Sequence, residues 1–303
     1  MGKTIFMTIY QYILKASLII SCLASLSIFI GCAKADPQDS IPEVRVAADV
    51  KRQTLSMVGV SANPSNPIIS YLDFEKNMGS WYERSLGYAW SAFLHGHTAR
   101  AGKSALRFEL RRGDSKHGYR SELGNKPNSQ KEGWYGFSNF FPASFVKDPV
   151  QEAVLQFHAH PDLIKGEAWR SPPVALIILN DRFVLDLRHD ARPVTKGELK
   201  LTRVDLGPVE KDVWIDWVFH VKWAWDNTGV LEIWKNNKLI VNRKNMPNCY
   251  NDLTYPYLKI GLYKWEWGWK STPAVQKRVY FLDELTIGTA AAGYDRVYPG
   301  RNR

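Results

Sequence analysis

Residues 257–270, YLKIGLYKWEWGWK, alternate in a way that decides the fold class of this chain. Every second position is apolar: Leu258, Ile260 and Leu262. The positions between them are Tyr257, Lys259, Gly261 and Tyr263. Because successive side chains of a β-strand point to opposite faces, the stretch predicts a strand with one face in the core and one face open. Trp265, Trp267 and Trp269 continue the second set, so we expect tryptophan on the open face as well.

The same alternation recurs in short segments from about residue 68 to Gly288. Clear cases are ALRFELRR (105–112), AVLQFHAH (153–160) and VLEIWKNNKLIV (230–241), the last with a plausible hairpin turn at Asn236-Asn237. Gly, Pro, Asn and Asp separate the segments, and no stretch has a convincing helical period. Many short strands and scarce helix predict an all-β fold, a sandwich of two sheets.

The first 35 residues have the composition of a secretory signal. Lys3 and Lys15 precede an apolar run that is too short for a comfortable membrane span. Two interpretations stay open: cleavage after Ala35 by ordinary signal peptidase, or a lipoprotein signal in which Cys32 carries the lipid. The mature protein is therefore expected to be secreted or periplasmic, or an outer-membrane lipoprotein anchored through Cys32.

The rest of the chain divides into an arm, a domain and a tail. Residues 36–67 are rich in Pro, Ser and Asn without a sustained period, which predicts a linker. Residues 68–290 carry the strand pattern, and residues 291–303 are expected to be a C-terminal tail. Since only Cys249 remains after the signal, the domain has to be stable without an intrachain disulfide. We expect a monomer.

The charge of the chain points to an anionic partner. The formal net charge is +10, and the three lysines in residues 1–35 leave about +7 on the mature chain. For a secreted protein, the candidate partners are acidic polysaccharide, phospholipid headgroups and nucleic acid. A charge excess that serves only solubility is the plain alternative.

Three segments place reactive side chains two or four positions apart. They are Arg120 and Glu122 in YRSELGN, Gln156 and His158 in LQFHAH, and Lys259 and Tyr263 in the opening stretch. Positions two apart share a face, so three neighbouring strands would gather these groups in one cleft. Such a set suits β-elimination of a uronate polysaccharide. Arg and Gln can neutralise the carboxylate, His fits the role of the base that removes the C5 proton, and Tyr can give or take a proton.

The three segments resemble the signature motifs of family 7 alginate lyases. YRSEL, QFH and YLKIGLYK follow the order of the family's Arg-x-Glu, Gln-(Ile/Val)-His and Tyr-Lys-Ala-Gly-Val-Tyr-Asn-Gln motifs. The chain is still more similar to the group of heparin lyase I and the glucuronan lyases. WYGFSNFFP, WIDWVFHVKW, GVLEIWKNNKLI and YLKIGLYKW carry that likeness. The resemblance covers most of residues 70–288 and implies a concanavalin-like β-jelly roll whose concave sheet holds the sugar chain.

The resemblance implies a role for each matched residue. Arg120 and Gln156 would neutralise the carboxylate, Tyr263 would be the acid and a candidate base, and His158 would be the base or its helper. An acidic polysaccharide then becomes the expected partner, with no nucleic acid and no membrane contact beyond the lipid anchor. No cofactor is required, and no metal-ligand cluster is evident, although the sandwich leaves room for a structural calcium ion.

Two departures from the alginate motifs bear on the substrate. Gly124 stands where a second Arg is usual, and Lys264-Trp265 replaces Asn-Gln. These departures favour glucuronan or another glucuronate chain over alginate. Six residues are expected to contact the substrate around the four catalytic candidates: Glu122, His117, His160, Lys259, Lys264 and Trp265.

Two other functions fit parts of the pattern. A non-catalytic carbohydrate-binding sandwich would use the same basic groove and aromatic side chains, but it would not need Gln156, His158 and Tyr263 together. A sandwich-fold glycoside hydrolase would need a Glu-x-Asp-x-x-Glu strand with paired carboxylates, which the sequence lacks. A polysaccharide lyase is therefore the function that the sequence predicts.

Overall fold

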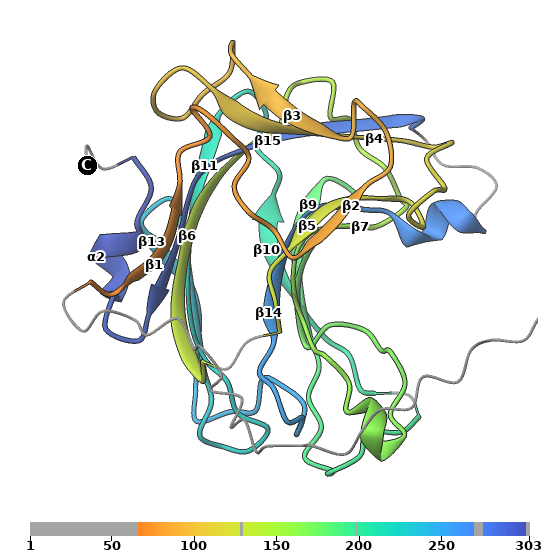
Figure 1. Cartoon of the computed structure of the whole chain (residues 1–303), viewed down its shortest axis with the longest axis vertical. Coiled ribbons are helices and arrows are strands. Elements are labelled where there is room, and N and C mark those ends of the chain that lie inside the picture. The colour runs from red at the N-terminus through yellow and green to blue at the C-terminus, as the bar shows by residue number, and fades with distance from the viewer. Residues whose placement is uncertain (1–65, 128–129, 198, 270–274, 301–303) are drawn as a thin grey trace, which may run out of the picture. The chain divides into compact units, whose positions relative to one another are not determined.

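The computed structural model describes residues 66–127, 130–197, 199–269 and 275–300. The expected signal, its lipid-anchor residue Cys32 and the linker up to residue 65 lie outside these residues. Two antiparallel sheets face one another in the described domain (Figure 1). The predicted all-β jelly-roll sandwich is thereby confirmed.

The first sheet has eight strands. In spatial order they are β13 (Lys238–Lys244), β12 (Val230–Lys235), β11 (Trp214–Lys222), β6 (Glu132–Phe140), β15 (Lys277–Thr289), β4 (Ala105–Arg111) and β3 (Ala92–His95), with β1 (Ile68–Leu72) also paired to β15. The hairpin between β12 and β13 turns at Asn236 and Asn237, as predicted, with φ angles of 49° and 66°. Asparagine is among the residues that tolerate this left-handed conformation in a two-residue turn.

The second sheet has seven strands. Its order is β10 (Thr202–Pro208), β9 (Arg182–Leu187), β8 (Val174–Leu179), β7 (Glu152–His158), β14 (Tyr257–Tyr263), β5 (Arg120–Gly124) and β2 (Glu83–Leu86). The 3-10 helix η1 (Leu163–Lys165) follows β7, and η2 (Trp265–Gly268) follows β14. In Figure 1 these two short helices lie at opposite ends of the open side of this sheet.

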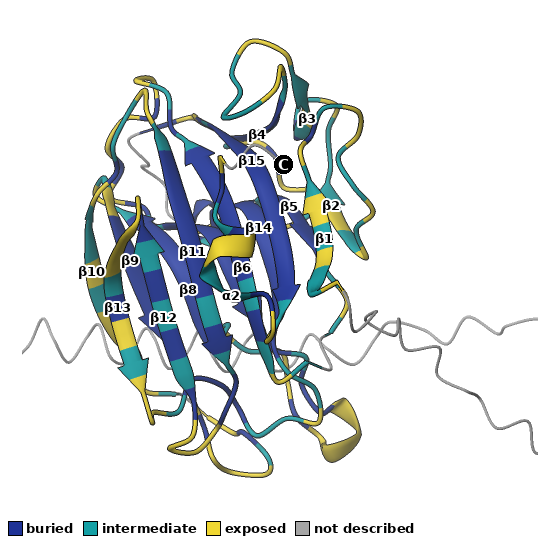
Figure 2. Cartoon of the chain, turned by 90° about the vertical axis from the view of Figure 1, so that its left-hand side faces the viewer, coloured by how far each residue is buried: buried dark blue, intermediate teal, exposed yellow. Residues whose placement is uncertain are grey.

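The core lies between the two sheets. Leu106, Phe108 and Leu110 of β4 are fully buried there, as the alternation predicted, and so are Ile260 and Leu262 of β14. Figure 2 shows that the central strands are almost entirely buried while the edge strand β13 is largely exposed. The apolar faces of the two sheets therefore pack against each other, and the outer face of the second sheet is not needed for the core.

The C-terminal segment contributes to the domain. Residues 293–297, within the expected tail, form helix α2 (Gly293–Val297), and Val297 is fully buried. Helix α2 lies over the outer face of the first sheet (Figure 2), and Val297 packs in a small apolar cluster with Val218 of β11. Cys249 is a buried free cysteine. Among the described residues, no helix has the length and apolarity needed to cross a membrane.

Candidate active site

The three strands with reactive side chains are direct neighbours in the second sheet. Strand β14 pairs with β5 on one side and with β7 on the other. Lys259 stands opposite Gln156, Tyr257 stands opposite His158, and Tyr263 stands opposite Arg120. The sequence prediction that these strands lie side by side is confirmed.

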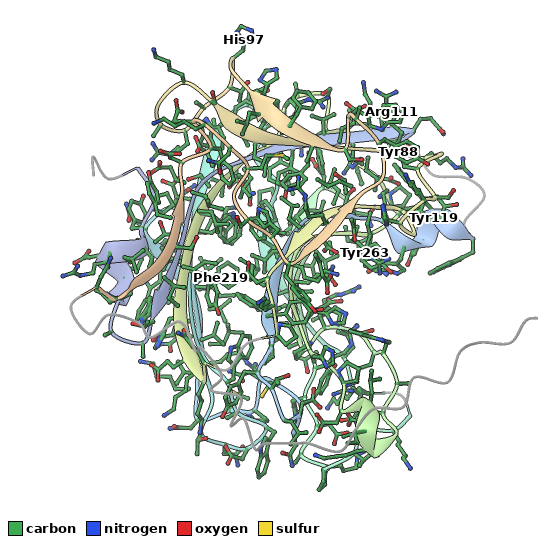
Figure 3. The ribbon with its side chains drawn as sticks, viewed as in Figure 1. Tyr88, His97, Arg111, Tyr119, Phe219 and Tyr263 are labelled. Carbon is green, nitrogen blue, oxygen red and sulfur yellow. The ribbon has the colours of Figure 1, made fainter. Side chains whose placement is uncertain are left out.

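A cleft of about 600 Å³ lies on the open face of this sheet. It is lined by the catalytic candidates Arg120, Gln156, His158 and Tyr263, together with Lys259, Trp265, Glu83, Trp169, Arg170, Asp186, Arg188 and Tyr257. Figure 3 shows Tyr263 on the outer side of the sheet, away from Phe219, which is fully buried between the two sheets. The cleft and the core thus lie on opposite faces of the same strands.

Glu122 lies buried beneath the cleft and joins three of its side chains. Its Oε1 accepts a hydrogen bond from Gln156 Nε2, and its Oε2 lies 3.2 Å from Lys259 Nζ and 3.8 Å from Arg120 Nε. Lys259 also pairs with Glu83 at 2.9 Å. Burial disfavours the charge of Lys259, but Glu122 and Glu83 outweigh it and raise the pKa of this lysine. Glu122 therefore orients the cleft instead of meeting a substrate, since only 1% of it is exposed.

Arg120 and Tyr263 form a stacked pair. The guanidinium carbon of Arg120 lies 3.6 Å from the centre of the Tyr263 ring. Burial raises the pKa of Tyr263, and the nearby Arg120 offsets part of that rise. The hydroxyl accordingly keeps its proton at neutral pH and can donate it.

Gly261 gives Tyr263 its position. The pairing of β14 with β7 shifts register between Ile260 and Tyr263. Gly261 in this bulge has a φ of 138°, and a Cβ there would lie 2.2 Å from the carbonyl oxygen of Ser121. A side chain at this position would collide with β5, so glycine is required between Lys259 and Tyr263.

His158 is held by its own backbone. Its Nδ1 lies 2.7 Å from the carbonyl oxygen of Ala159. Since a carbonyl only accepts hydrogen bonds, Nδ1 carries the hydrogen and Nε2 keeps its lone pair. Burial lowers the pKa of His158, and the positive charge of Lys259 acts in the same direction. The imidazole is thus neutral at pH 7 and able to accept a proton.

Two residues expected in the cleft are elsewhere. Lys264 is fully buried, with its Nζ 3.0 Å from Asp148 Oδ2, so the prediction that it contacts the substrate is wrong. Trp267 is 4% exposed and belongs to the core, because β14 ends at Tyr263 and η2 begins at Trp265. A 3-10 helix has three residues per turn, so positions two apart no longer share a face.

The remaining candidates are at the edge of the site. Trp265 lines the cleft with its ring 5.2 Å from that of Tyr263, whereas Trp269 is 68% exposed and is not part of the lining. His117 is outside the lining and contributes its carbonyl oxygen, which accepts a hydrogen bond of 3.2 Å from Arg120 Nη1. His160 is also outside the lining and packs against Trp169 at 5.4 Å.

Sequence reasoning missed several residues of the cleft lining, among them Glu83, Trp169 and Arg188. Glu83 comes from the edge strand β2, Trp169 from the loop after β7, and Arg188 from the end of β9. Arg188 continues the alternation of Val184 and Asp186, so its facing could have been inferred once β9 was assigned to this sheet. The sequence carries no signal that brings Glu83 or Trp169 to the same place.

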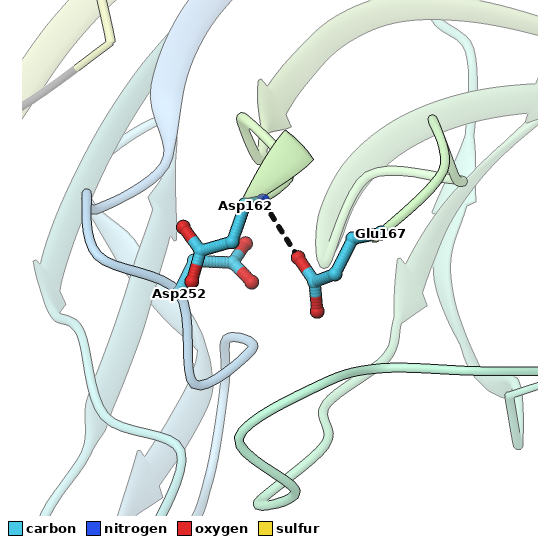
Figure 4. Close-up of side chains that lie close together, drawn as sticks. All are labelled: Asp162, Glu167 and Asp252. Atoms are coloured by element: carbon cyan, nitrogen blue, oxygen red, sulfur yellow. Dashed lines mark hydrogen bonds between the residues drawn. The ribbon is translucent and has the colours of Figure 1, made fainter. Parts of the chain in front are cut away.

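Three acidic side chains form the best candidate for a metal site among the described residues. Asp162, Glu167 and Asp252 each place an oxygen within 4.8 Å of the others (Figure 4). Five of their six oxygens already accept hydrogen bonds: both of Asp162, both of Glu167 and Oδ1 of Asp252. Asp252 Oδ2 has no such partner, and burial raises the pKa of Asp252 to about 7.

Protein cations already compensate this acidic cluster. Lys165 Nζ lies 2.7 Å from Asp162, and Arg170 bridges Glu167 and Asp252. A bound cation would have to displace these partners, so the cluster is a poor fit to a calcium site and serves to tie the loop after β7 to the segment before β14.

Comparisons with known proteins agree with the geometry. A sequence search of curated proteins finds no significant match. The crystal structure of an endo-beta-1,4-glucuronan lyase from the fungus Trichoderma reesei is similar in fold, with a TM-score of 0.67, 21% identity, and 77% of this chain and 99% of that chain covered. The alginate lyase AlyC3 matches with a TM-score of 0.44 and 15% identity over 63% of this chain and 79% of that chain.

A further match among solved structures is alginate lyase PA1167 from Pseudomonas aeruginosa. It has a TM-score of 0.39 and 16% identity, and the match covers 61% of this chain and 82% of that chain. The family model described as "Polysaccharide lyase" matches residues 73–286. The resemblance seen in the sequence motifs is confirmed, and this chain belongs to the polysaccharide lyase family.

Proposed function

We propose that this lyase cleaves a uronate-containing polysaccharide, of the glucuronan type, by β-elimination. The observation that carries the proposal is the neutral His158, oriented by Ala159 and set in the same cleft as the Arg120–Tyr263 pair. Elimination needs a base and an acid of different pKa on one face, and these two residues supply them.

In the proposed reaction, Nε2 of His158 removes the proton from C5 of the uronate. The electron pair of that C–H bond forms the C4=C5 double bond as the C4–O4 bond breaks. Tyr263 donates its proton to O4, so the products are an unsaturated uronate end and a new chain end, with no water consumed. Tyr263 is also a candidate for the base, with His158 as its helper.

The carboxylate of the substrate is the second requirement. While it is ionised, the C5 proton is only weakly acidic, and donors that hold the carboxylate stabilise the charge that develops in the transition state. We assign this task to Arg120 and to the second N–H of Gln156, whose first N–H is given to Glu122. Glu122, in turn, fixes that amide and Lys259 without touching the sugar.

The glucuronan type is supported by the departures from the alginate motifs at Gly124, which packs against the cleft residues Glu83 and Lys259, and at Trp265, which lines the cleft. The fold of the T. reesei glucuronan lyase is consistent with that choice. We further propose that the enzyme acts as a monomer without a cofactor. Residues 1–35 would direct its export and would be processed either by cleavage after Ala35 or by lipidation of Cys32. Mass spectrometry of the mature N-terminus distinguishes these two forms of processing.

Ultraviolet absorbance tests the reaction, because the double bond of the product is conjugated with its carboxylate. The mature protein is incubated with glucuronan, alginate, heparin, heparan sulfate and hyaluronan, each beside a Tyr263→Phe control. We expect a rise with glucuronan that the control lacks. Binding without any rise would favour a carbohydrate-binding module, and new reducing ends without absorbance would indicate hydrolysis.

A further inference from the structure

Two side chains at the β7–β9 end of the cleft take no part in the proposed chemistry. Arg188 follows β9, and Trp169 lies in the loop after β7. Both line the cleft that holds His158 and Gln156. Because a polysaccharide extends beyond the bond that is cleaved, side chains at the β7–β9 end of the cleft have access to other sugar units.

Arg188 has a weakly compensated positive charge. Its Nη2 lies 3.8 Å from Asp186 Oδ2, and its Nη1 makes a long hydrogen bond of 3.4 Å to the carbonyl oxygen of Pro172. Asp186 is bound instead by Arg203, at 2.7 and 2.8 Å. A guanidinium with such loose partners, in a cleft wall, is well placed to bind a carboxylate through two parallel hydrogen bonds.

The neighbouring Arg170 shows the contrast. It lines the same cleft, but its guanidinium is held by Glu167 at 3.0 Å and by Asp252. It also stacks on the ring of Tyr250 at 4.5 Å. Arg170 is therefore committed to the fold, and Arg188 is the guanidinium on this side that can respond to a ligand.

Trp169 supplies the second half of the site. Its side chain is 57% exposed, and its ring lies 5.8 Å from that of His158. A large exposed ring in a polar cleft presents a flat apolar face on which the C–H face of a sugar can pack. Its nearness to His158 places this platform beside the unit that is cleaved.

Arg188 and Arg120 are too far apart to hold the same carboxylate. Their strands, β9 and β5, are separated by β8, β7 and β14. Four strand intervals correspond to roughly 19 Å between the backbones. Since a uronate unit carries one carboxylate, the two guanidinium groups have to meet different units of the chain.

We propose that Arg188 and Trp169 form a subsite for a second uronate unit, in which Arg188 binds the carboxylate and Trp169 stacks on the ring. This inference rests on the proposed uronate substrate. It adds that the enzyme selects chains with repeated uronates over chains in which a single acidic unit is followed by neutral sugars.

Calorimetric titration of a glucuronan hexasaccharide tests the subsite, with Tyr263→Phe as the background that prevents turnover. Arg188→Gln removes the charge, and Arg188→Lys keeps it. Arg182→Gln is the matched control on the same strand, because Arg182 is outside the cleft lining and pairs with the exposed Asp205. Circular dichroism verifies that each variant is folded.

We expect Arg188→Gln to weaken binding about tenfold or more, which corresponds to one lost charged hydrogen bond. Arg188→Lys should recover part of the loss, and Arg182→Gln should bind like the background. With the carboxyl-reduced hexasaccharide, Arg188→Gln and the background should bind equally. Unchanged binding of the acidic hexasaccharide by Arg188→Gln, an equal loss with both sugars, or no binding in the background would each overturn the subsite.

Failure of the proposed reaction has a different signature. One outcome is that wild-type protein binds the hexasaccharide in a way that depends on Arg188 and still gives no absorbance with glucuronan. That result would contradict the proposed lyase reaction on glucuronan and would still support the subsite. If the protein turns over glucuronan and Arg188→Gln changes neither KM nor binding, the proposed reaction is supported and the subsite is contradicted.

Discussion

The Nδ1 atom of His158 lies 2.7 Å from the carbonyl oxygen of Ala159, the next residue in the chain. This contact fixes the tautomer of the imidazole without any side-chain partner and leaves Nε2 as the basic nitrogen. Burial lowers the pKa of the same ring. The end of β7 thus orients the proposed base, and burial keeps it neutral.

The pH dependence of kcat/KM follows from the two shifted pKa values. Burial lowers the pKa of His158 and raises that of Tyr263. His158 becomes protonated as the pH falls through its lowered pKa, so we expect activity to drop only below about 6.5. The alkaline limb should lie above about 10, where Tyr263 loses its proton. Initial rates of absorbance across this range, with circular dichroism at each pH, check the profile. An acid limb centred above 6.5 would contradict the assignment.

Glu122→Gln should reduce kcat/KM by about tenfold or more, because Gln156, Lys259 and Arg120 lose their shared anion. Burial is the main cause of the raised pKa of Tyr263, and Glu122 adds to it. The alkaline limb should therefore move to lower pH in this variant. A purely structural role would leave that limb in place. Glu210→Gln, which changes a carboxylate paired with Lys235 outside the cleft, is the matched control.

Trp265→Ala should raise KM about tenfold for the polymer, since this ring lines the cleft beside Tyr263. Trp269→Ala removes an equally large ring that is 68% exposed and outside the lining, and KM should stay unchanged. Steady-state kinetics on both variants decide the matter. Equal effects of the two substitutions would argue against a sugar contact at Trp265.

Lys264→Met should lower the free energy of unfolding by about 3–5 kcal/mol, because it leaves Asp148 as a buried carboxylate without its cation. Denaturant unfolding followed by tryptophan fluorescence measures the loss. Lys238→Met on the exposed part of β13 is the control and should change stability little. A higher KM in folded Lys264→Met protein, with normal stability, would restore the original assignment of this lysine to the substrate.

Exhaustive chelation should leave both turnover and the unfolding midpoint unchanged. The proposed acid, base and carboxylate donors are all side chains, and five of the six oxygens of Asp162, Glu167 and Asp252 already have donors. Differential scanning fluorimetry with EDTA, and then with added calcium, measures the midpoint. A rise of several degrees on adding calcium would show that the acidic cluster binds it.

The alternation in the sequence was sufficient for the strands and their facing. It placed Leu258, Ile260 and Leu262 in the core and left Lys259 and Tyr263 in the cleft, because period two is a property of the strand alone. The motif order also brought the correct three strands together.

The same reasoning failed where the strand stopped. Lys264 is at an even position, like the core residues Leu258, Ile260 and Leu262. It is buried there because it forms ion pairs with Asp148 at 3.0 Å and Glu152 at 3.6 Å. Trp267 points inward because a 3-10 turn replaces the strand after Tyr263. The facing of Arg188 follows the alternation of β9, but its place in the cleft depends on the assignment of β9 to this sheet. The place of Trp169 depends on where the loop after β7 lies, and the local sequence pattern does not contain that information.

The four catalytic candidates all come from the paired strands β5, β7 and β14, whereas Trp169, Arg188 and Trp265 lie beyond strand ends. A shift of one position in a strand moves every side chain of that strand to the opposite face of the sheet. A loop, by contrast, can change in length and composition at little cost in stability. Selection can therefore alter which polymer is recognised while the reaction itself is inherited intact. The two traits are separable in evolution, and an engineer can exchange the loops with the same expectation.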